Sequence, residues 1–143
     1  MKIAMACDHG GLELKESIKK YLEEQGIEVL DLGTNTTDSV DYPEYGKACG
    51  EAVASGKVER GIVCCGTGIG ISIAANKVKG VRCALCTDAH MAEMTRKHND
   101  ANILAMGGRI IDVETAKNIT QTWLDTKFEG GRHQRRIDML NNM

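Results

Sequence analysis

The stretch Gly61-Ile-Val-Cys-Cys-Gly-Thr-Gly-Ile-Gly70 decides how this chain folds. Its apolar part, Ile62 to Cys64, predicts a short buried strand, and the glycines after it predict a tight turn. The apolar run from Ile71 to Ala75 then predicts a helix. A strand that passes through glycines into a helix start directs backbone N–H groups at one point, where they favour an anion or a thiolate. Cys65 is therefore a candidate reactive thiol, although the spacing of the glycines matches neither common nucleotide-binding fingerprint.

Strand-like and helix-like segments alternate along the rest of the chain. Apolar runs predict strands over residues 2–7, 28–32, 60–64, 82–86 and 103–106. Helical spacing predicts helices over residues 12–26, 42–54, 68–77, 89–97, 113–127 and 132–141, with Asp88 and Asp112 as N-caps. Such alternation indicates βαβ units and a parallel sheet covered on both faces. We therefore predict an α/β fold, a three-layer αβα sandwich around a Rossmann-like five-stranded parallel sheet, forming one domain over residues 1–143.

Composition narrows the class of partner. The net charge of −2 and the sequence pI near 6.1 argue against nucleic acid as the main partner. No apolar run approaches the ~20 residues of a membrane span, and the first residues do not form a signal peptide. We expect a cytoplasmic protein that contacts no membrane.

The six cysteines do not predict a disulfide framework. They lie in apolar strand-like runs or, for one of them, in a helical pattern: Cys7, Cys64, Cys65, Cys83, Cys86 and Cys49. Cys83 and Cys86 have C-x-x-C spacing, but no second motif accompanies them, and on a strand they point to opposite faces. We therefore expect no metal site and interpret every cysteine except Cys65 as a reduced, buried apolar side chain.

Polar residues gather where the predicted strands end, which is where parallel sheets bind ligands. Asp8-His9 follows the first strand, Cys65-Gly66-Thr67 the third and Gly107-Gly108-Arg109 the fifth. For Cys65, a reactive thiol and a merely packed strand-end residue are about equally good interpretations. Thr67 is suited to cap the next helix or to bond a substrate oxygen, and Asp8 to cap the first helix or to bind a ligand. The position of the Asp8-His9 pair favours ligand contact.

Two more clusters lie in the second half of the chain. The first is His98-Asn99-Asp100-x-Asn102; a helix end with Asn99 in the left-handed conformation would explain part of it, but four polar side chains exceed that need. The second is Arg132 and Arg136, which stand on one face of the last helix at i, i+4 spacing, with Arg135 off that face. Such a pair suits a phosphate group, and a solvated basic surface is the alternative.

Taken together, these motifs resemble the ribose-5-phosphate isomerase B family, which shares its fold with the galactose-6-phosphate isomerase subunits. The resemblance covers the whole chain and is carried by Asp8-His9-Gly-Gly, Asp41-Tyr42-Pro43, Gly66-Thr-Gly-Ile-Gly70, His98-Asn99-Asp-x-Asn102 and Arg132-x-x-x-Arg136. It implies an aldose–ketose isomerase of the pentose phosphate pathway. Such an enzyme interconverts D-ribose 5-phosphate and D-ribulose 5-phosphate through an enediolate without a cofactor, with a side activity on allose/psicose-type sugars.

The resemblance also implies roles for matching residues. Cys65 resembles the base that moves a proton between C1 and C2, and His98, with Asp8, the acid that opens the sugar ring. Thr67 and the amides of the following turn resemble the hole that stabilises the enediolate: Gly66, Gly68, Ile69 and Gly70. The remaining residues resemble a phosphate clamp (Arg132, Arg136, His9 and Arg109) and sugar contacts (Tyr42 and Asn99).

The family further implies a homodimer, or a dimer of dimers, in which His98, Asn99 and Arg109 enter the neighbouring subunit's site. Because Ile71 to Ala75 holds no carboxylate, the chain resembles the subtype that uses a cysteine base.

Three alternatives remain at this stage. A galactose-6-phosphate isomerase subunit lies within the same family, but the intact set of cysteine, histidine and arginines favours a self-sufficient enzyme. A cysteine-dependent phosphatase needs an arginine shortly after its cysteine, and the residues after Cys65 have none. A non-catalytic module that binds a nucleotide or sugar phosphate is the third, and Asp31 before Leu32-Gly33 fits the isomerase family equally well.

Overall fold

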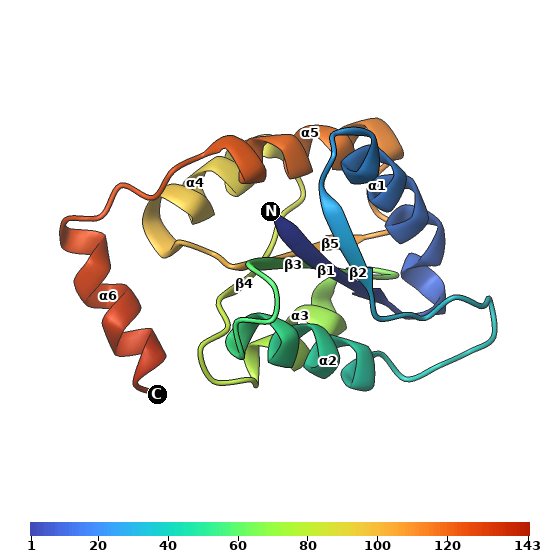
Figure 1. Cartoon of the computed structure of the whole chain (residues 1–143), viewed down its shortest axis with the longest axis horizontal. Coiled ribbons are helices and arrows are strands. Elements are labelled where there is room, and N and C mark those ends of the chain that lie inside the picture. Colours follow the sequence, from blue (N-terminus) through green and yellow to red (C-terminus); the bar gives the residue numbers. More distant parts are fainter.

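Five parallel strands form one sheet in the order β2-β1-β3-β5-β4 (Figure 1). The computed structural model describes residues 1–143 and places the strands at β1 (Lys2–Cys7), β2 (Glu28–Asp31), β3 (Arg60–Cys65), β4 (Cys83–Leu85) and β5 (Ile103–Gly107). The strand quoted at the outset, β3, lies at the centre of the sheet, between β1 and β5. The predicted α/β fold with a five-stranded parallel sheet is confirmed.

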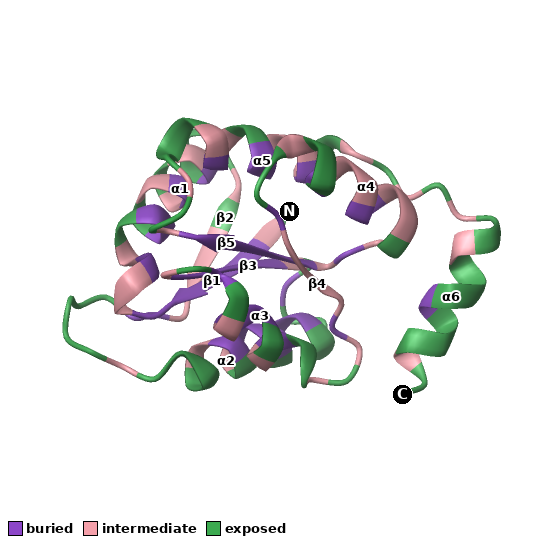
Figure 2. Ribbon diagram, turned by 180° about the vertical axis from the view of Figure 1, so that it is seen from behind, coloured by how far each residue is buried: buried purple, intermediate pink, exposed green.

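Helices cover both faces of the sheet, as predicted. One face carries α1 (Leu12–Glu24), α4 (Ala89–Asn99) and α5 (Val113–Asp125), and the other carries α2 (Tyr42–Ala54) and α3 (Ile69–Asn76) (Figure 1). The last helix, α6 (Arg132–Asn141), stands at one end of these layers and buries only Ile137 (Figure 2). None of the helices combines the length and the apolar character that crossing a membrane requires.

Alternating side chains divide the interior of the protein into two apolar clusters, one on each face of the sheet. Cys64 belongs to the cluster under α1 and α5, which includes the fully buried Trp123, whereas Cys65 belongs to the cluster under α2 and α3. Figure 2 shows how completely β1, β3 and β5 are buried between these layers. Cys83 and Cys86 likewise pack on opposite faces, and all six cysteines are free.

The predicted helix starts agree with the structure better than the predicted helix ends. The carboxylates of Asp88 and Asp112 each accept a hydrogen bond of 2.8 Å from the amide three residues later, so both predicted N-caps are confirmed. The prediction for the end of α4 was wrong, because the helix continues through Asn99 and Asp100 is the left-handed residue, with φ 46°. Asp100 tolerates this position because its carboxylate pairs with Arg96 at 2.7 Å.

The strand ends that approach β3 are packed backbone against backbone. A Cβ atom at Gly11 would overlap the carbonyl group of Cys64, and one at Gly108 would lie 2.7 Å from the Gly10 oxygen. A Cβ atom at Gly107 would lie 2.5 Å from the Thr67 oxygen. Real Cβ atoms do not approach backbone this closely, so only glycine lets the three turns after β1, β3 and β5 touch.

Replacing Gly11 tests this packing. We expect Gly11→Ala to lower the free energy of unfolding by about 3 kcal/mol, because the new methyl group must push the Cys64 carbonyl out of the sheet. Gly56→Ala is the control: Gly56 has φ 78° but open space around it, so only backbone strain of about 1 kcal/mol is expected. Urea denaturation measures both values, and equal losses would show that the contact with Cys64 is easily relieved.

Candidate active site

The turn after β3 places one backbone N–H group, that of Gly68, at the Cys65 sulfur. The Gly68 amide donates a hydrogen bond of 3.1 Å to Cys65 Sγ, and Gly68 itself adopts the left-handed conformation, with φ 81°. The Thr67 hydroxyl accepts a hydrogen bond of 3.2 Å from the amide of Ile69, the first residue of α3. Thr67 therefore satisfies a helix N–H from just before the N-cap position, which Gly68 occupies.

The other cysteines are held as thiols by burial. Burial raises the pKa of Cys7 to about 11 and that of Cys49 and of Cys86 to about 12. It also raises the pKa of Cys64 and of Cys83 well above the usual range of a thiol. The Cys65 side chain points to the opposite face of the sheet from Cys64, its immediate neighbour, and its sulfur accepts a hydrogen bond from the Gly68 amide.

The end of β1 lies directly against this turn. The Asp8 carboxylate is buried and accepts a hydrogen bond of 2.9 Å from the Gly10 amide, so it caps the single 3-10 turn, His9–Gly11, that precedes α1. A Cβ atom at Gly10 would lie 3.0 Å from the Gly66 nitrogen. His9 Nδ1 accepts a hydrogen bond of 3.2 Å from the Val40 amide, so the neutral ring carries its proton on Nε2. Asp8 and His9 therefore lie at the same edge as Cys65.

Arg109 and Tyr42 flank the turn from two sides. The Arg109 guanidinium lies next to the turn, 3.3 Å from where a Cβ atom of Gly66 would be, and the Arg109 amide donates a hydrogen bond of 2.9 Å to the Gly66 oxygen. Within one chain, Arg109 therefore lies beside its own Gly66, and the expectation that it enters a neighbouring subunit's site stays a prediction. The Tyr42 ring covers Gly70, where a Cβ atom would lie 2.6 Å from Tyr42 Cζ.

Four of the predicted site residues lie elsewhere in the same chain: His98, Asn99, Arg132 and Arg136. In a βαβ unit the helix runs back against the strands, so α4 ends at the amino-terminal edge of the sheet. The length of β5 separates that edge from the Cys65 turn by about 16 Å. Arg132 and Arg136 are exposed on α6 and make no ion pair. One chain therefore holds two separate groups of candidate residues.

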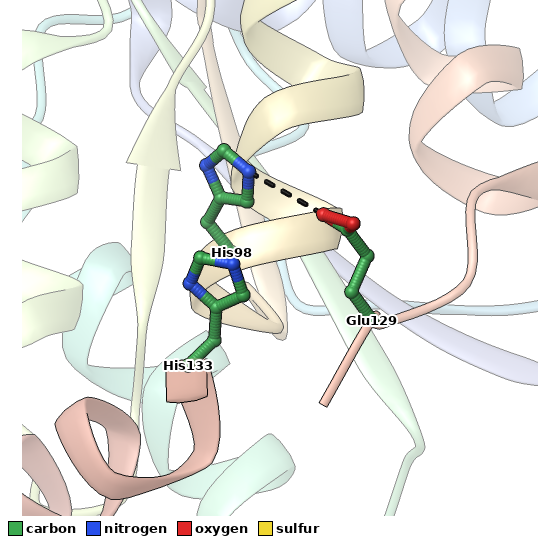
Figure 3. Close-up of side chains that lie close together, drawn as sticks. All are labelled: His98, Glu129 and His133. Atoms are coloured by element: carbon green, nitrogen blue, oxygen red, sulfur yellow. Dashed lines mark ion pairs between the residues drawn. The ribbon is translucent and has the colours of Figure 1, made fainter. Parts of the chain in front are cut away.

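The His98 ring is nevertheless held by two residues, His133 of α6 and Glu129, which precedes α6. The ring stacks on that of His133, with centroids 4.4 Å apart and an interplanar angle of 18°, and Glu129 Oε1 lies 3.5 Å from His98 Nε2 (Figure 3). Burial, His98 and Arg132 lower the pKa of His133. Three potential metal ligands gather here, His98, Glu129 and His133, with ligand atoms within 4.8 Å of one another. The sequence interpretation missed His133 and Glu129, although His133 directly follows Arg132.

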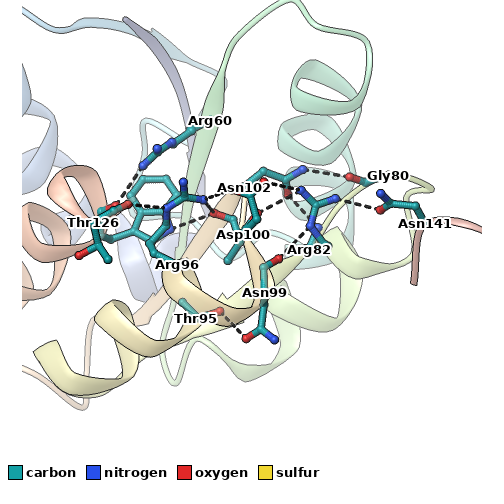
Figure 4. Close-up of polar contacts among 12 residues, drawn as sticks. Arg60, Gly80, Arg82, Thr95, Arg96, Asn99, Asp100, Asn102, Thr126 and Asn141 are labelled. Atoms are coloured by element: carbon teal, nitrogen blue, oxygen red, sulfur yellow. Dashed lines mark hydrogen bonds and ion pairs between the residues drawn. The ribbon is translucent and has the colours of Figure 1, made fainter. Parts of the chain in front are cut away.

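The rest of the 98–102 cluster is structural (Figure 4). Asp100 pairs with Arg96 at 2.7 Å and with Arg82 at 3.8 Å. The side chain of Asn102 accepts a hydrogen bond of 2.7 Å from the Arg82 amide and donates one of 2.9 Å to the Gly80 oxygen. The prediction that four polar side chains here indicate function was therefore too broad, since two of them tie the end of α4 to the start of β4 and β5.

Comparison with known proteins identifies the family. The sequence profile of the family described as Ribose/Galactose Isomerase matches residues 3–140. The chain belongs to this family. The predicted resemblance is thereby confirmed, and it extends over nearly the whole length of the chain.

Members of the ribose/galactose isomerase family match in both sequence and structure. Ribose-5-phosphate isomerase B of Escherichia coli is 48% identical over 97% of this chain and 93% of its own length. The solved structure of ribose-5-phosphate isomerase B from Clostridium thermocellum is 53% identical, with a TM-score of 0.98 over 99% of this chain and 96% of that one. The Mycoplasma genitalium enzyme, solved with bound ribulose-5-phosphate, is 40% identical, with a TM-score of 0.95 over 99% of this chain and 94% of that one.

Thiol modification tests the distinct position of Cys65. Because burial keeps the other five cysteines protonated, we expect a brief exposure to iodoacetamide near neutral pH to label Cys65 first. Peptide mass spectrometry of the folded protein, sampled over time, locates the label. Cys83, the half-buried member of the set, is the internal control, and earlier labelling at Cys83 would contradict the assignment.

Proposed function

We propose that this chain is a ribose-5-phosphate isomerase, which interconverts D-ribose 5-phosphate and D-ribulose 5-phosphate with Cys65 as the base. The observation that carries the proposal is the Cys65 sulfur, which meets a turn amide at the ligand-binding edge of the sheet. The names of relatives along the full chain, including one structure with bound ribulose-5-phosphate, support this substrate class.

The chemistry needs one base, donors for a developing negative charge and a grip on the phosphate. In the open-chain aldose, Cys65 takes the proton from C2 and returns it to C1, while the hydroxyl proton passes from the C2 oxygen to the C1 oxygen. The amides from Gly66 to Gly70, with the Thr67 hydroxyl, are suited to stabilise the enediolate oxygen between these steps. Tyr42 and Asn99 are the proposed sugar contacts. The step exchanges protons only, so electrons and atoms balance without a redox cofactor.

The proposed site is shared between two copies of the chain. Ring opening is assigned to His98, with Asp8, and the phosphate to His9 and Arg109 together with Arg132 and Arg136. Within one chain these residues fall into two groups at opposite edges of the sheet, and a second copy would bring one chain's His98 and arginines to the other's Cys65. A homodimer with two shared sites follows. The six free cysteines favour the cytoplasm, where thiols stay reduced.

A substrate panel tests the reaction itself. A relative from Pectobacterium atrosepticum, 40% identical over 98% of this chain, is named D-erythrulose-4-phosphate isomerase, so family members differ in sugar. We expect turnover of ribose 5-phosphate to exceed that of allose 6-phosphate, erythrulose 4-phosphate, galactose 6-phosphate and free ribose. Preferred turnover of another sugar phosphate, or of none, would contradict the proposal.

Mixing two inactive variants tests the shared site. Cys65→Ala and His98→Ala are each expected to lose at least about 10²-fold in kcat, because each lacks a proton-transfer group. After the two are unfolded and refolded together, half of the dimers are mixed, and each mixed dimer holds one intact site. Roughly a quarter of wild-type activity should therefore return. Cys64→Ala is the control and should keep near-full kcat; no recovery on mixing would place both groups in one chain's site.

Removing one arginine of α6 tests the phosphate clamp. We expect Arg136→Ala to raise KM for ribose 5-phosphate by about 10- to 150-fold, the worth of a charge-assisted bidentate contact. Activity on free ribose or allose should change little, and Arg136→Lys should recover only part of the loss, because lysine lacks the planar fork. Arg135→Ala, from the other face of α6, is the matched control. Equal losses on phosphorylated and free sugars would indicate that Arg136 holds the protein together instead.

A further inference from the structure

Lys15 is a fully buried lysine beneath the rim of the candidate active site. Its side chain is 0% exposed, on the face of α1 that also buries Ile18 and Leu22. Lys15, Ile18 and Leu22 stand at i, i+3 and i+7 on one face of α1, where an amphipathic helix normally carries apolar residues. Burial of an ammonium group costs several kcal/mol unless its donors are satisfied, so a buried lysine that apolar packing does not need calls for another explanation.

The ammonium group of Lys15 is satisfied by the segment that follows β2. It donates hydrogen bonds to Asp31 Oδ1 at 2.7 Å, to the Thr34 oxygen at 2.7 Å and to Asn35 Oδ1 at 3.1 Å. Burial acts to raise the pKa of Asp31, but hydrogen bonds from Lys15, the Gly33 amide and Lys19 outweigh it and lower the pKa. The single ammonium group of Lys15, on α1, thus binds three oxygen atoms of residues 31–35.

This segment begins the 34–41 loop, which leads to the proposed substrate contacts (Figure 1). Near its other end, the Val40 amide donates to His9 Nδ1 at 3.2 Å and thereby fixes the ring orientation and the tautomer of His9. Tyr42, directly after the loop, covers Gly70 of the Cys65 turn. The start of the loop is paired with β1, since the Thr34 amide donates a hydrogen bond of 2.8 Å to the Cys7 oxygen, whereas the middle of the loop, residues 35–39, is exposed.

We propose that Lys15 is a positioning residue, whose ammonium group anchors the 34–41 loop and so holds His9 and Tyr42 in place for substrate binding. The inference rests on the proposed function of the site. Loss of Lys15 should affect substrate binding rather than the chemical step, because the Cys65 turn is held by contacts at Gly68, Gly107 and Gly108. None of these contacts involves Lys15.

The variant Lys15→Met removes the ammonium group and keeps most of the side-chain volume. The Asp31 carboxylate retains Lys19 at 3.2 Å and the Gly33 amide at 2.9 Å, so no buried charge is left alone. We expect KM for ribose 5-phosphate to rise about tenfold with kcat within about threefold of wild type. Faster hydrogen exchange at the Val40 amide and a mixture of His9 tautomers, seen in imidazole ¹⁵N shifts, should accompany this.

Arg60→Met is the matched control. Arg60 starts β3 at the opposite edge of the sheet, donates a hydrogen bond of 3.0 Å to the Trp123 oxygen and covers the Trp123 ring. Its loss should lower the free energy of unfolding without changing KM or Val40 exchange. Should Lys15→Met fail to fold, Asn35→Ala removes one acceptor of the ammonium group, and a KM increase of about two- to threefold is expected.

The outcomes separate the two proposals. An inactive wild-type protein would overturn the proposed function, and Val40 exchange with the His9 tautomer would then decide the role of Lys15 alone. In an active protein, an unchanged KM in Lys15→Met would overturn the positioning role, whether or not stability falls. A drop in kcat with KM unchanged would also overturn the positioning role, because Lys15 would then act on the Cys65 turn.

Discussion

Direct contact between backbones at the end of β3 is the constraint on which the rest of this structure depends. Gly11 touches Cys64, Gly107 touches Thr67 and Gly108 touches Gly10, without room for a Cβ atom in any of these places. Because side chains cannot separate the three turns, the groups that they carry gather at the edge of the sheet where β3 ends. The same closeness lets the Gly108 amide donate a hydrogen bond of 2.8 Å to the Cys65 oxygen, so backbone contacts hold Cys65 in place.

Buried and half-buried cations hold the segments that are not fixed by glycine packing. Lys15 binds the segment after β2, and Arg82 and Arg96 bind the end of α4 through Asp100. Arg82 also donates a hydrogen bond of 2.9 Å to Asn141 Oδ1, which ties α6 to the same junction. A buried ion pair adds little net stability compared with apolar packing, but it specifies one geometry, because each donor needs its own acceptor. That property suits loops and helix ends that carry functional side chains.

Separation of the candidate residues into two groups has a topological cause. A helix between two parallel strands must return to the start of the next strand, so side chains at its end are kept away from the carboxyl ends of the strands. His98 is therefore directed away from Cys65 in its own chain, and α6 continues outward from that edge (Figure 1). In the proposed homodimer, the exposed arginines of one copy would meet the turn of the other.

The sequence by itself determined the class of fold, the strand and helix sequence and the residues around Cys65, because apolar periodicity and glycine spacing act locally along the chain. Asp8, His9, Thr67 and Arg109 could be assigned to one edge of the sheet by the rule for parallel strands alone. Only the tertiary structure decided which polar residues are structural, as for Asp100 and Asn102, and that the Arg109 guanidinium lies beside Gly66 of its own chain. It alone revealed the stacking of His133 on His98 and the burial of Lys15. These depend on contacts between segments far apart in sequence, whose partners no local pattern of residues specifies.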